Sequence, residues 1–494
     1  MQGDFSRTTF DPLKHYSAVL AQQGRVQLDA DFNEQAAILL RQLRTVVADL
    51  VGPARAPAGG GGFEITQVTT DGTTTPVRED LAISRGRIYV DGLLVENDLP
   101  GATYWTQPDL RLEPDADELP PEGAFVVYLR VWERLVTALQ DPAIREIALG
   151  DPGPDTSARA KTVWQVAALA VAATEVGAAE QEFAEKLVGF RPTGLLTAQA
   201  KRPPLAAEDA CHLPPDNLFR GHENQLYRVE VHTGGQAWWA NGSTDTARRS
   251  AVLSGATFKW SRENASVVFP VVSLSGAVAT LGSPGRDGKL GLEVGDRVEL
   301  VDDATAGRVA DDVAAAEYPV AASRLRTVVA IDAADLRVTL DSQEGDDDCG
   351  LGANPFLRRW DHLPGPGTPD IAEDGALPLI EGRWHELEDG VQVFFEGPPA
   401  PPDGEGDGRS TGTYRRGDYW LIPARTANGD VLWPKNEFRP PNGVEYHYAP
   451  LAYVTGDTVD ATLRKTFVPL TEGSAPVREE PKPKTTAGRR KTTG

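Results

Sequence analysis

The sequence predicts a mainly β, multi-domain protein with one N-terminal α-helix. The chain has 494 residues, a length typical of two to four domains. Most of its apolar residues occur in short runs with a period of two, and one stripe near the N-terminus has a helical period. Glycine and proline make up about 18% of the chain against about 12% on average, which indicates many turns between short antiparallel strands.

A helix is expected over residues 32–51. Its apolar stripe consists of Ala36, Leu39, Leu40, Leu43, Val46, Val47 and Leu50. Asp31-Phe32-Asn33-Glu34 has the form of a capping box, and Gly52-Pro53 supplies the stop. Because the stripe keeps an a/d spacing for about two heptads, a helix of another subunit could cover it. Packing on its own chain is the alternative.

The strands are expected after a glycine-rich connector at residues 54–62, which contains four consecutive glycines. Residues 83–95 read as a hairpin that turns at Asp91-Gly92. A helix is expected at 178–187, and residues 345–367 and 398–412 are expected to be loops. The other expected strands are 125–133, 163–172, 225–232, 256–260, 266–272, 391–396, 419–423 and 447–454.

These elements divide the chain into six predicted segments. The module at 286–345, with a hairpin around 333–335, is expected to be a small β-barrel or sandwich. The full division is 1–62, an N-terminal docking segment with the amphipathic helix and glycine linker; 63–223, a β-rich α+β domain; 224–285, a β segment of the central body; 286–345, the barrel-like module; 346–475, a C-terminal β domain; and 476–494, a disordered basic tail.

Charge and composition exclude several classes of partner. The formal net charge is −23, and a field of that sign repels phosphate backbones, so nucleic acid is not an expected partner. No apolar run approaches the roughly 18 residues of a membrane span, and the start has no signal-peptide pattern, so we expect no membrane insertion and a cytoplasmic location. Cys211 and Cys349 are expected to be unpaired thiols.

The sequence contains no catalytic motif in a suitable structural context, so no catalytic residue, cofactor or metal ligand is predicted. The one GxSxG match, at 408–412, lies in a loop-like segment rather than between a strand and a helix. The seven histidines form neither HxH nor HExxH, and no phosphate-binding GxxxxGK[ST] is present. Acidic clusters at 302–303, 311–312 and 346–348, and the alternating Asp29, Asp31 and Asn33, do not fit a calcium loop, although calcium binding stays open.

Several segments of the sequence carry a resemblance to other proteins. They are Met1-Gln2-Gly3-Asp4-Phe5, Phe10-Asp11-Pro12, Gln22-Gln23-Gly24-Arg25 with Gln27 to Gln35, Val131-Trp132-Glu133-Arg134, residues 223–230, residues 258–264 and residues 417–425. These segments resemble a family of large bacterial proteins encoded among phage-tail-like, contractile-injection gene clusters. No catalytic residues are assigned in that family. The N-terminal stretch is also similar, more loosely, to the first segments of phage baseplate and tail-fibre proteins.

The resemblance implies a non-enzymatic structural component of such a particle, at the baseplate or a tail-fibre-like appendage. Its expected partners are other particle subunits or further copies of itself. The alternative is a tailspike-like protein that binds or cleaves cell-surface polysaccharide, for which the aromatic pairs Tyr104-Trp105, Trp238-Trp239 and Trp384-His385 would supply stacking surfaces. The residues predicted to dock on a partner are Arg25, Leu28, Asp31, Phe32, Asn33, Glu34, Leu39, Leu43 and Val46.

Overall fold

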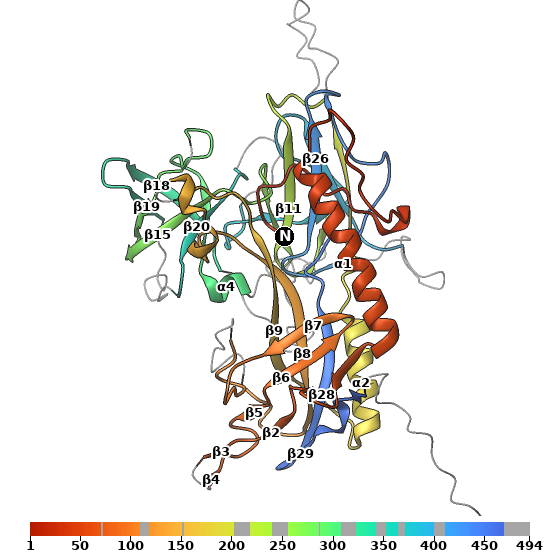
Figure 1. Cartoon of the computed structure of the whole chain (residues 1–494). Coiled ribbons are helices and arrows are strands. Elements are labelled where there is room, and N and C mark those ends of the chain that lie inside the picture. The colour runs from red at the N-terminus through yellow and green to blue at the C-terminus, as the bar shows by residue number, and fades with distance from the viewer. Residues whose placement is uncertain are drawn as a thin grey trace, which may run out of the picture.

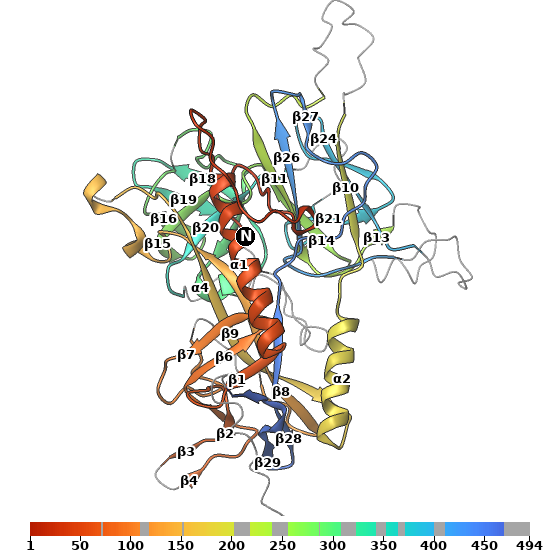
Figure 2. The same ribbon diagram turned by 45° about the vertical axis from the view of Figure 1, so that its right-hand side comes forward.

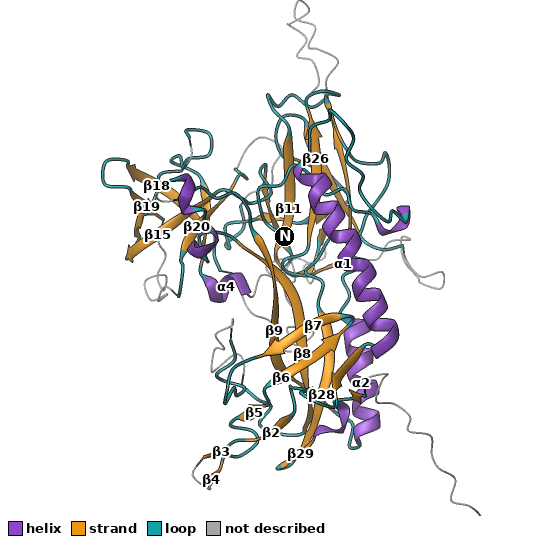
Figure 3. Ribbon diagram, viewed as in Figure 1, coloured by secondary structure: helices purple, strands orange, loops and turns teal. Residues whose placement is uncertain are grey.

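The computed structural model is mostly β, as predicted, with few helices (Figures 1 and 3). Its strands form three bodies, which we call the first body, the sandwich and the barrel. The described residues are 1–70, 73–108, 118–150, 153–201, 218–239, 255–285, 287–307, 323–341, 352–363, 371–399 and 411–468.

The first body is built on two long antiparallel strands, β8 and β9, which pair without a break from Ala124↔Val171 to Val136↔Arg159. Valine, leucine and aromatic residues dominate both strands, which favours extended backbone. One sheet has the order β29-β28-β8-β9 and a second has the order β30-β1-β6-β7. The strands are β1 (Ala54–Pro57), β6 (Gly86–Val90), β7 (Leu93–Asn97), β8 (Ala124–Val136), β9 (Arg159–Val171), β28 (His447–Thr455), β29 (Thr458–Asp460) and β30 (Thr466–Phe467).

The turn between β6 and β7 is the predicted one. Asp91 and Gly92 both have positive φ, 47° and 82°, as a two-residue type I′ turn requires. Two small hairpins complete this body: β2 (Ile65–Gln67) with β5 (Leu81–Ile83), and β3 (Thr69–Thr70) with β4 (Thr73–Thr74).

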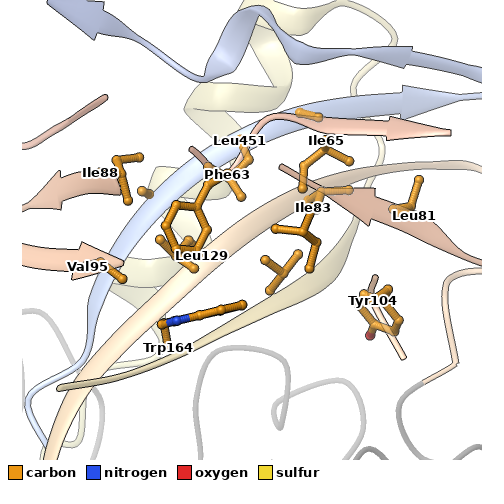
Figure 4. Packing of buried hydrophobic residues seen from close by; sticks show 14 of the residues in the cluster. Phe63, Ile65, Leu81, Ile83, Ile88, Val95, Tyr104, Leu129, Trp164 and Leu451 are labelled. Carbon is orange, nitrogen blue, oxygen red and sulfur yellow. The ribbon is translucent and has the colours of Figure 1, made fainter. Parts of the chain in front are cut away.

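Figure 4 shows the core of the first body, where side chains from both sheets meet. Phe63 packs edge-on against Trp164, with ring centroids 5.0 Å apart. Leu129 comes from β8 and Leu451 from β28, more than 300 residues later in the chain. The core therefore cannot be completed without the C-terminal strands.

Helix α2 (Val176–Gly189) covers the other face of the β8/β9 sheet. Its Phe183 ring lies 5.1 Å from Tyr128 of β8. The Glu182 carboxylate accepts hydrogen bonds from the backbone N–H groups of Ala172 and Ala173, each at 3.0 Å. This helix lies within three residues of the predicted boundaries at each end, and its apolar face is filled by its own chain.

The sandwich consists of two sheets with the orders β10-β24-β22-β13 and β21-β14-β11-β26-β27. Alternating residues of each sheet point into a shared core that includes Trp420, Phe258 and Phe395. The strands are β10 (Leu195–Ala200), β11 (Gln225–Thr233), β13 (Trp238–Trp239), β14 (Thr257–Ser261), β21 (Leu377–Pro378), β22 (Ile380–Glu381), β23 (Trp384–Glu386), β24 (Val391–Glu396), β26 (Tyr419–Arg425) and β27 (Asp430–Val431), with β12 (Gly235–Gln236) and β25 (Thr413–Tyr414) as a small ribbon beside them.

The barrel is closed, with the strand order β15-β16-β19-β18-β17-β20. A small barrel was predicted at 286–345, but the observed one extends further in both directions. Strands before and after that module close it, because β20 pairs with both β15 and β17. Its elements are β15 (Val268–Ser275), β16 (Val278–Leu281), β17 (Arg297–Val301), β18 (Arg326–Asp332), β19 (Arg337–Leu340), β20 (Phe356–Trp360) and the short helix α4 (Asp303–Gly307).

A buried network of charges joins the barrel to the sandwich. Glu299 of β17 lies 2.9 Å from Lys259 of β14, and Lys259 lies 3.5 Å from Glu230 of β11. Burial alone would raise the pKa of Glu299, but the charges of Lys259 and Arg358 lower it to about 2. Arg228 lies 2.5 Å from Glu230 and completes the network. Because a buried charge without its partner lowers the stability of the fold, these pairs fix the position of the barrel relative to the sandwich.

Two predictions about local structure were wrong. The expected connector at 54–62 is structured: Ala54–Pro57 is β1, and Gly62 lies so close to the backbone of Gly86 that a Cβ would clash. The segment 345–367 contains β20. The predicted segments 224–285 and 346–475 each contribute strands to more than one body, because the sandwich and the first body both take strands from distant parts of the chain. Cys211, Cys349 and the basic tail lie outside the described residues.

Among the described residues, the remaining helical elements are α1 (Asp29–Val51) and four short 3₁₀ turns at Pro12–Lys14, Pro142–Ile144, Ile147–Leu149 and Ala461–Leu463. No helix in the described ranges combines the length and apolar character needed to cross a membrane.

Candidate docking surface

Helix α1 runs along the outside of the molecule, beside the first body and up to the sandwich (Figures 1 and 2). Only Ala30 and Ile38 of its 23 residues are buried. The Arg44 guanidinium binds both carboxylate oxygens of Glu133 on β8, at 3.0 and 2.7 Å. The β6–β7 turn is packed so closely on the helix that a Cβ at Gly92 would clash with the carbonyl oxygen of Arg44. These contacts fix one side of α1 to the body.

The segment before the helix lies along its first half. The backbone N–H and hydroxyl of Ser6 donate to the Asp29 carboxylate at 2.9 and 2.6 Å. The Thr9 hydroxyl donates to Glu34 at 2.6 Å, and the backbone N–H of Val19 donates to the Gln35 side chain at 2.7 Å. Slight burial would raise the pKa of Asp29, but the hydrogen bonds from Ser6 hold it below its ordinary value.

The predicted capping box is wrong. The helix begins at Asp29, two residues before the expected cap, and its N-cap is Leu28, which makes no side-chain capping bond. Glu34 turns to Thr9 instead of reaching back to the first turn. The carboxylates of Asp29 and Asp31 lie in the first turn, where their negative charge interacts favourably with the positive end of the helix dipole. The acidic residues therefore stabilise the start of the helix through their charge and through bonds to the N-terminal segment, not through a capping box.

The opposite side of α1 is an apolar surface that no part of the described chain covers. The exposed fractions are 77% for Phe32, 54% for Leu39, 60% for Leu43, 54% for Val46 and 66% for Leu50. Of the residues predicted to dock, these first four lie on one face of the helix. Arg25 and Leu28 are also exposed, in the segment that leads into it, and Asn33 is exposed at its first turn.

Asp31 and Glu34 are half-buried and belong to the side that faces the N-terminal segment. Two exposed apolar residues of the helix, Leu40 and Leu50, were in the predicted stripe but not among the predicted docking residues. The spacing of the stripe could have placed Leu50 there, because it lies seven residues after Leu43.

Glu388, a carboxyl group with a raised pKa, is occupied by contacts within the protein. Glu388 and Glu263 lie where the sandwich meets the barrel, and burial raises the pKa of each to about 7. Glu388 accepts from the Tyr227 hydroxyl at 3.1 Å, and its other oxygen lies 2.9 Å from Arg262. Both oxygens of Glu388 are engaged by the protein itself, whereas a general acid must reach a bound substrate.

Metal-binding and sugar-stacking features are sparse. Within the described ranges, His, Cys, Asp and Glu side chains form no group of three that could hold a metal ion. Tyr104 and His385 are buried, and the Trp105 indole donates to the Glu79 carbonyl oxygen. Trp384, 36% exposed, lies at the outer face of the sandwich with its ring 5.4 Å from that of Phe394. The GxSxG match begins outside the described residues.

These features define a β-rich protein in which a barrel is inserted into a sandwich and one helix presents an apolar face to solvent. The chain belongs to the family of unknown function DUF6519, whose model matches residues 1–187 and 190–440. The match includes α1, the barrel and all the strands of the sandwich. None of the curated proteins matches this chain.

Proposed function

We propose that this protein is a non-enzymatic structural subunit of a phage-tail-like contractile injection particle, placed at the baseplate or at a tail-fibre-like appendage. Its N-terminal region attaches it to its neighbours, and the three bodies serve as a rigid scaffold. In this proposal the chain is assembled into the particle in the cytoplasm.

The observation that carries the proposal is the exposed apolar surface of the N-terminal region. Beyond the α1 face, Leu13, Leu20 and Val26 are 81%, 82% and 84% exposed. Contiguous apolar patches of more than a few hundred Å² are rare on monomeric proteins and mark interaction sites. The resemblance of segments between Met1 and Gln35 to proteins of phage-tail-like gene clusters supports the proposal of this kind of particle.

The direct test is to purify particles from the native host and search them for this chain by mass spectrometry. We expect the chain in intact particles, at a fixed ratio to the other subunits. A deletion strain should assemble defective particles. Absence of the chain from intact particles, together with normal assembly and firing in the deletion strain, would refute the proposal.

A matched pair of variants tests the attachment. Leu20→Gln with Val26→Gln changes two exposed apolar residues of the N-terminal segment, and Val272→Gln changes an apolar residue on the barrel that is 71% exposed. Complementation of the deletion strain should fail with the first variant and succeed with the second. Equal incorporation of both variants would show that residues 20 and 26 do not contribute to attachment.

The second candidate is a tailspike-like protein that binds or cleaves polysaccharide, and Trp384 is the observation that favours it. Its exposed indole, beside Phe394, offers an apolar face on which a sugar ring could stack. Binding of the purified chain to surface polysaccharide of a target cell, lost in Trp384→Ala and retained in Val272→Ala, would support this candidate.

A further inference from the structure

The α1 face has the geometry of a coiled-coil seam. Its exposed residues follow one another at intervals of four, three, four, three and four positions, which is the a/d pattern of a heptad repeat. At about 1.5 Å per residue, the seam is about 27 Å long. The seam residues are Phe32, Ala36, Leu39, Leu43, Val46 and Leu50, all exposed.

The partner that fits this seam is a helix. A repeat of 3.5 residues keeps the apolar positions on one side only when a second helix winds around the first, with each side chain packed between four of its partner. The seam is separate from the side of α1 that its own chain covers, since Ile38 and Arg44 point to the body. In Figure 2 no other labelled helix or strand lies in front of α1.

The charges around the seam allow an identical helix to approach. The protein carries a net charge of −23, so most of its surface repels a second copy. The positions that flank the seam are uncharged for most of its length, and only Asp49 carries a charge. The flanking residues are Asn33, Gln35, Leu40, Gln42, Val47 and Asp49. A partner of opposite charge has little to pair with here, whereas two copies meet without like-charge repulsion.

The exposed area is large enough for a stable contact. A fully exposed large apolar residue has roughly 200 Å² of accessible surface. With the exposed fractions of Phe32, Leu39, Leu40, Leu43, Val46 and Leu50, the face offers on the order of 700 Å² per copy. A standard stable interface buries about 800 Å² per partner, so the seam and its amide-bearing flanks supply nearly all that is needed.

We infer that α1 is the self-association element of this protein, and that its seam packs against the α1 seam of a second copy. This inference rests on the proposed function for its purpose, because it makes sister subunits the occupant of the helix face and leaves the exposed residues 13–28 for the particle. Leu40 and Val47 widen the seam on one side, a pattern that also suits bundles of more than two helices.

Analytical ultracentrifugation of the purified full chain tests the inference. We expect the wild-type chain to sediment with at least twice the mass of one chain at about 10–50 μM. Leu39→Gln with Leu43→Gln should shift it to a single chain, because glutamine keeps the helix propensity of leucine but not its apolar surface. Val188→Gln, at an exposed apolar residue of α2, is the matched control and should leave the mass unchanged.

Circular dichroism must show equal helix content in all three proteins, which separates lost association from lost folding. A wild-type chain that is monomeric up to about 100 μM would overturn the inference, as would an unchanged oligomer in the double variant. The proposed function fails separately: a self-associating chain that is absent from particles refutes the particle proposal alone, and a monomeric chain found in particles refutes the seam alone.

Discussion

Helices α1 and α2 are both amphipathic and both flank the first body, but only the apolar face of α2 is covered by the rest of the chain. In α2 the apolar face is closed by its own chain, with Phe183 against Tyr128 of β8. In α1 the apolar face is open, and the helix is held from behind by Ile38 and the Arg44–Glu133 pair. The difference teaches that amphipathicity predicts that a surface will be covered, but not by which chain.

The largest expected effect concerns the closed helix. Phe183→Ala removes a ring that is 2% exposed, and the resulting cavity should lower the free energy of unfolding of the first body by about 3–4 kcal/mol. Hydrogen exchange measured by mass spectrometry on peptides from β8 and β9 reports this loss locally. Unchanged exchange there would mean that α2 does not stabilise the sheet, and the comparison with α1 would collapse.

The next effect concerns the anchor of the open helix. Ile38 is the one large apolar residue that α1 buries, at 2% exposure, so Ile38→Ala should cost about 2–3 kcal/mol of local stability. We expect faster hydrogen exchange over residues 29–51 and little change in β8 and β9. If both regions lose protection equally, α1 is an integral part of the first body rather than an attached element.

A pH series separates the stability of the folded chain from self-association through α1. Burial lowers the pKa of His232, His362 and His385 to about 4. The neutral form of each histidine therefore suits the folded state, and the unfolded state, with a pKa near 6.5, binds more protons. Stability is lost as the pH falls from 6.5 towards 4. Glu263 and Glu388, with pKa values raised to about 7, act in the opposite direction, since their contribution is lost as the pH rises through 7.

Burial also lowers the pKa of the Met1 amino group to about 5. Three histidines and this amino group against two glutamates leave between one and two net protons taken up on unfolding between pH 5 and 6. The free energy of unfolding should therefore fall by about 2 kcal/mol per pH unit on acidification in that range. Chemical denaturation at pH 5.0, 5.5 and 6.0 measures it. The six seam positions carry no titratable side chain, so self-association should hardly change over the same range. A parallel loss of both would show that the seam depends on the body.

The smallest effect is expected at the seam itself. In dilute protein, below the concentration at which copies associate, Leu39→Gln with Leu43→Gln should change the free energy of unfolding by less than about 0.5 kcal/mol, because both side chains are exposed in a single chain. Thermal unfolding at about 0.1 μM against Val188→Gln is the measurement. A loss of several kcal/mol would mean that the α1 face is covered within one chain.

Local patterns predicted the elements well because they depend on neighbours in sequence. The period of the stripe placed α1 with the correct end at Val51, and Asp91-Gly92 identified its hairpin because only a few residues tolerate positive φ at both positions. The alternation of apolar residues gave β8, β9, β11 and β28 to within a few residues. The mainly β class followed from these elements.

What the sequence did not reveal depends on partners far along the chain. The N-terminus of α1 was misplaced because Asp29 and Glu34 bind Ser6 and Thr9 rather than the first turn. The predicted bounds of the barrel were too narrow because β20, which lies outside the predicted module, closes it. The buried pairs of Lys259 with Glu230 and Glu299 come from three strands, and their spacing in sequence carries no signal. Whether the α1 face is covered by its own chain was likewise a question that only the packing could answer.

The return of β28 to pair with β8 also determines the order in which the molecule can form. About 310 residues separate the two strands, and pairings across such distances are slow to form, because the loop between them must close first. The barrel is contiguous from Val268 to Trp360 and can fold while the chain is still being synthesised, whereas the first body must wait for residues 447–467. During that interval the N-terminal half of the chain holds both α1 and an unfinished sheet edge at β8. We expect translation to be the period of greatest aggregation risk for this protein, and premature contact between nascent α1 helices to be its most direct route to misassembly.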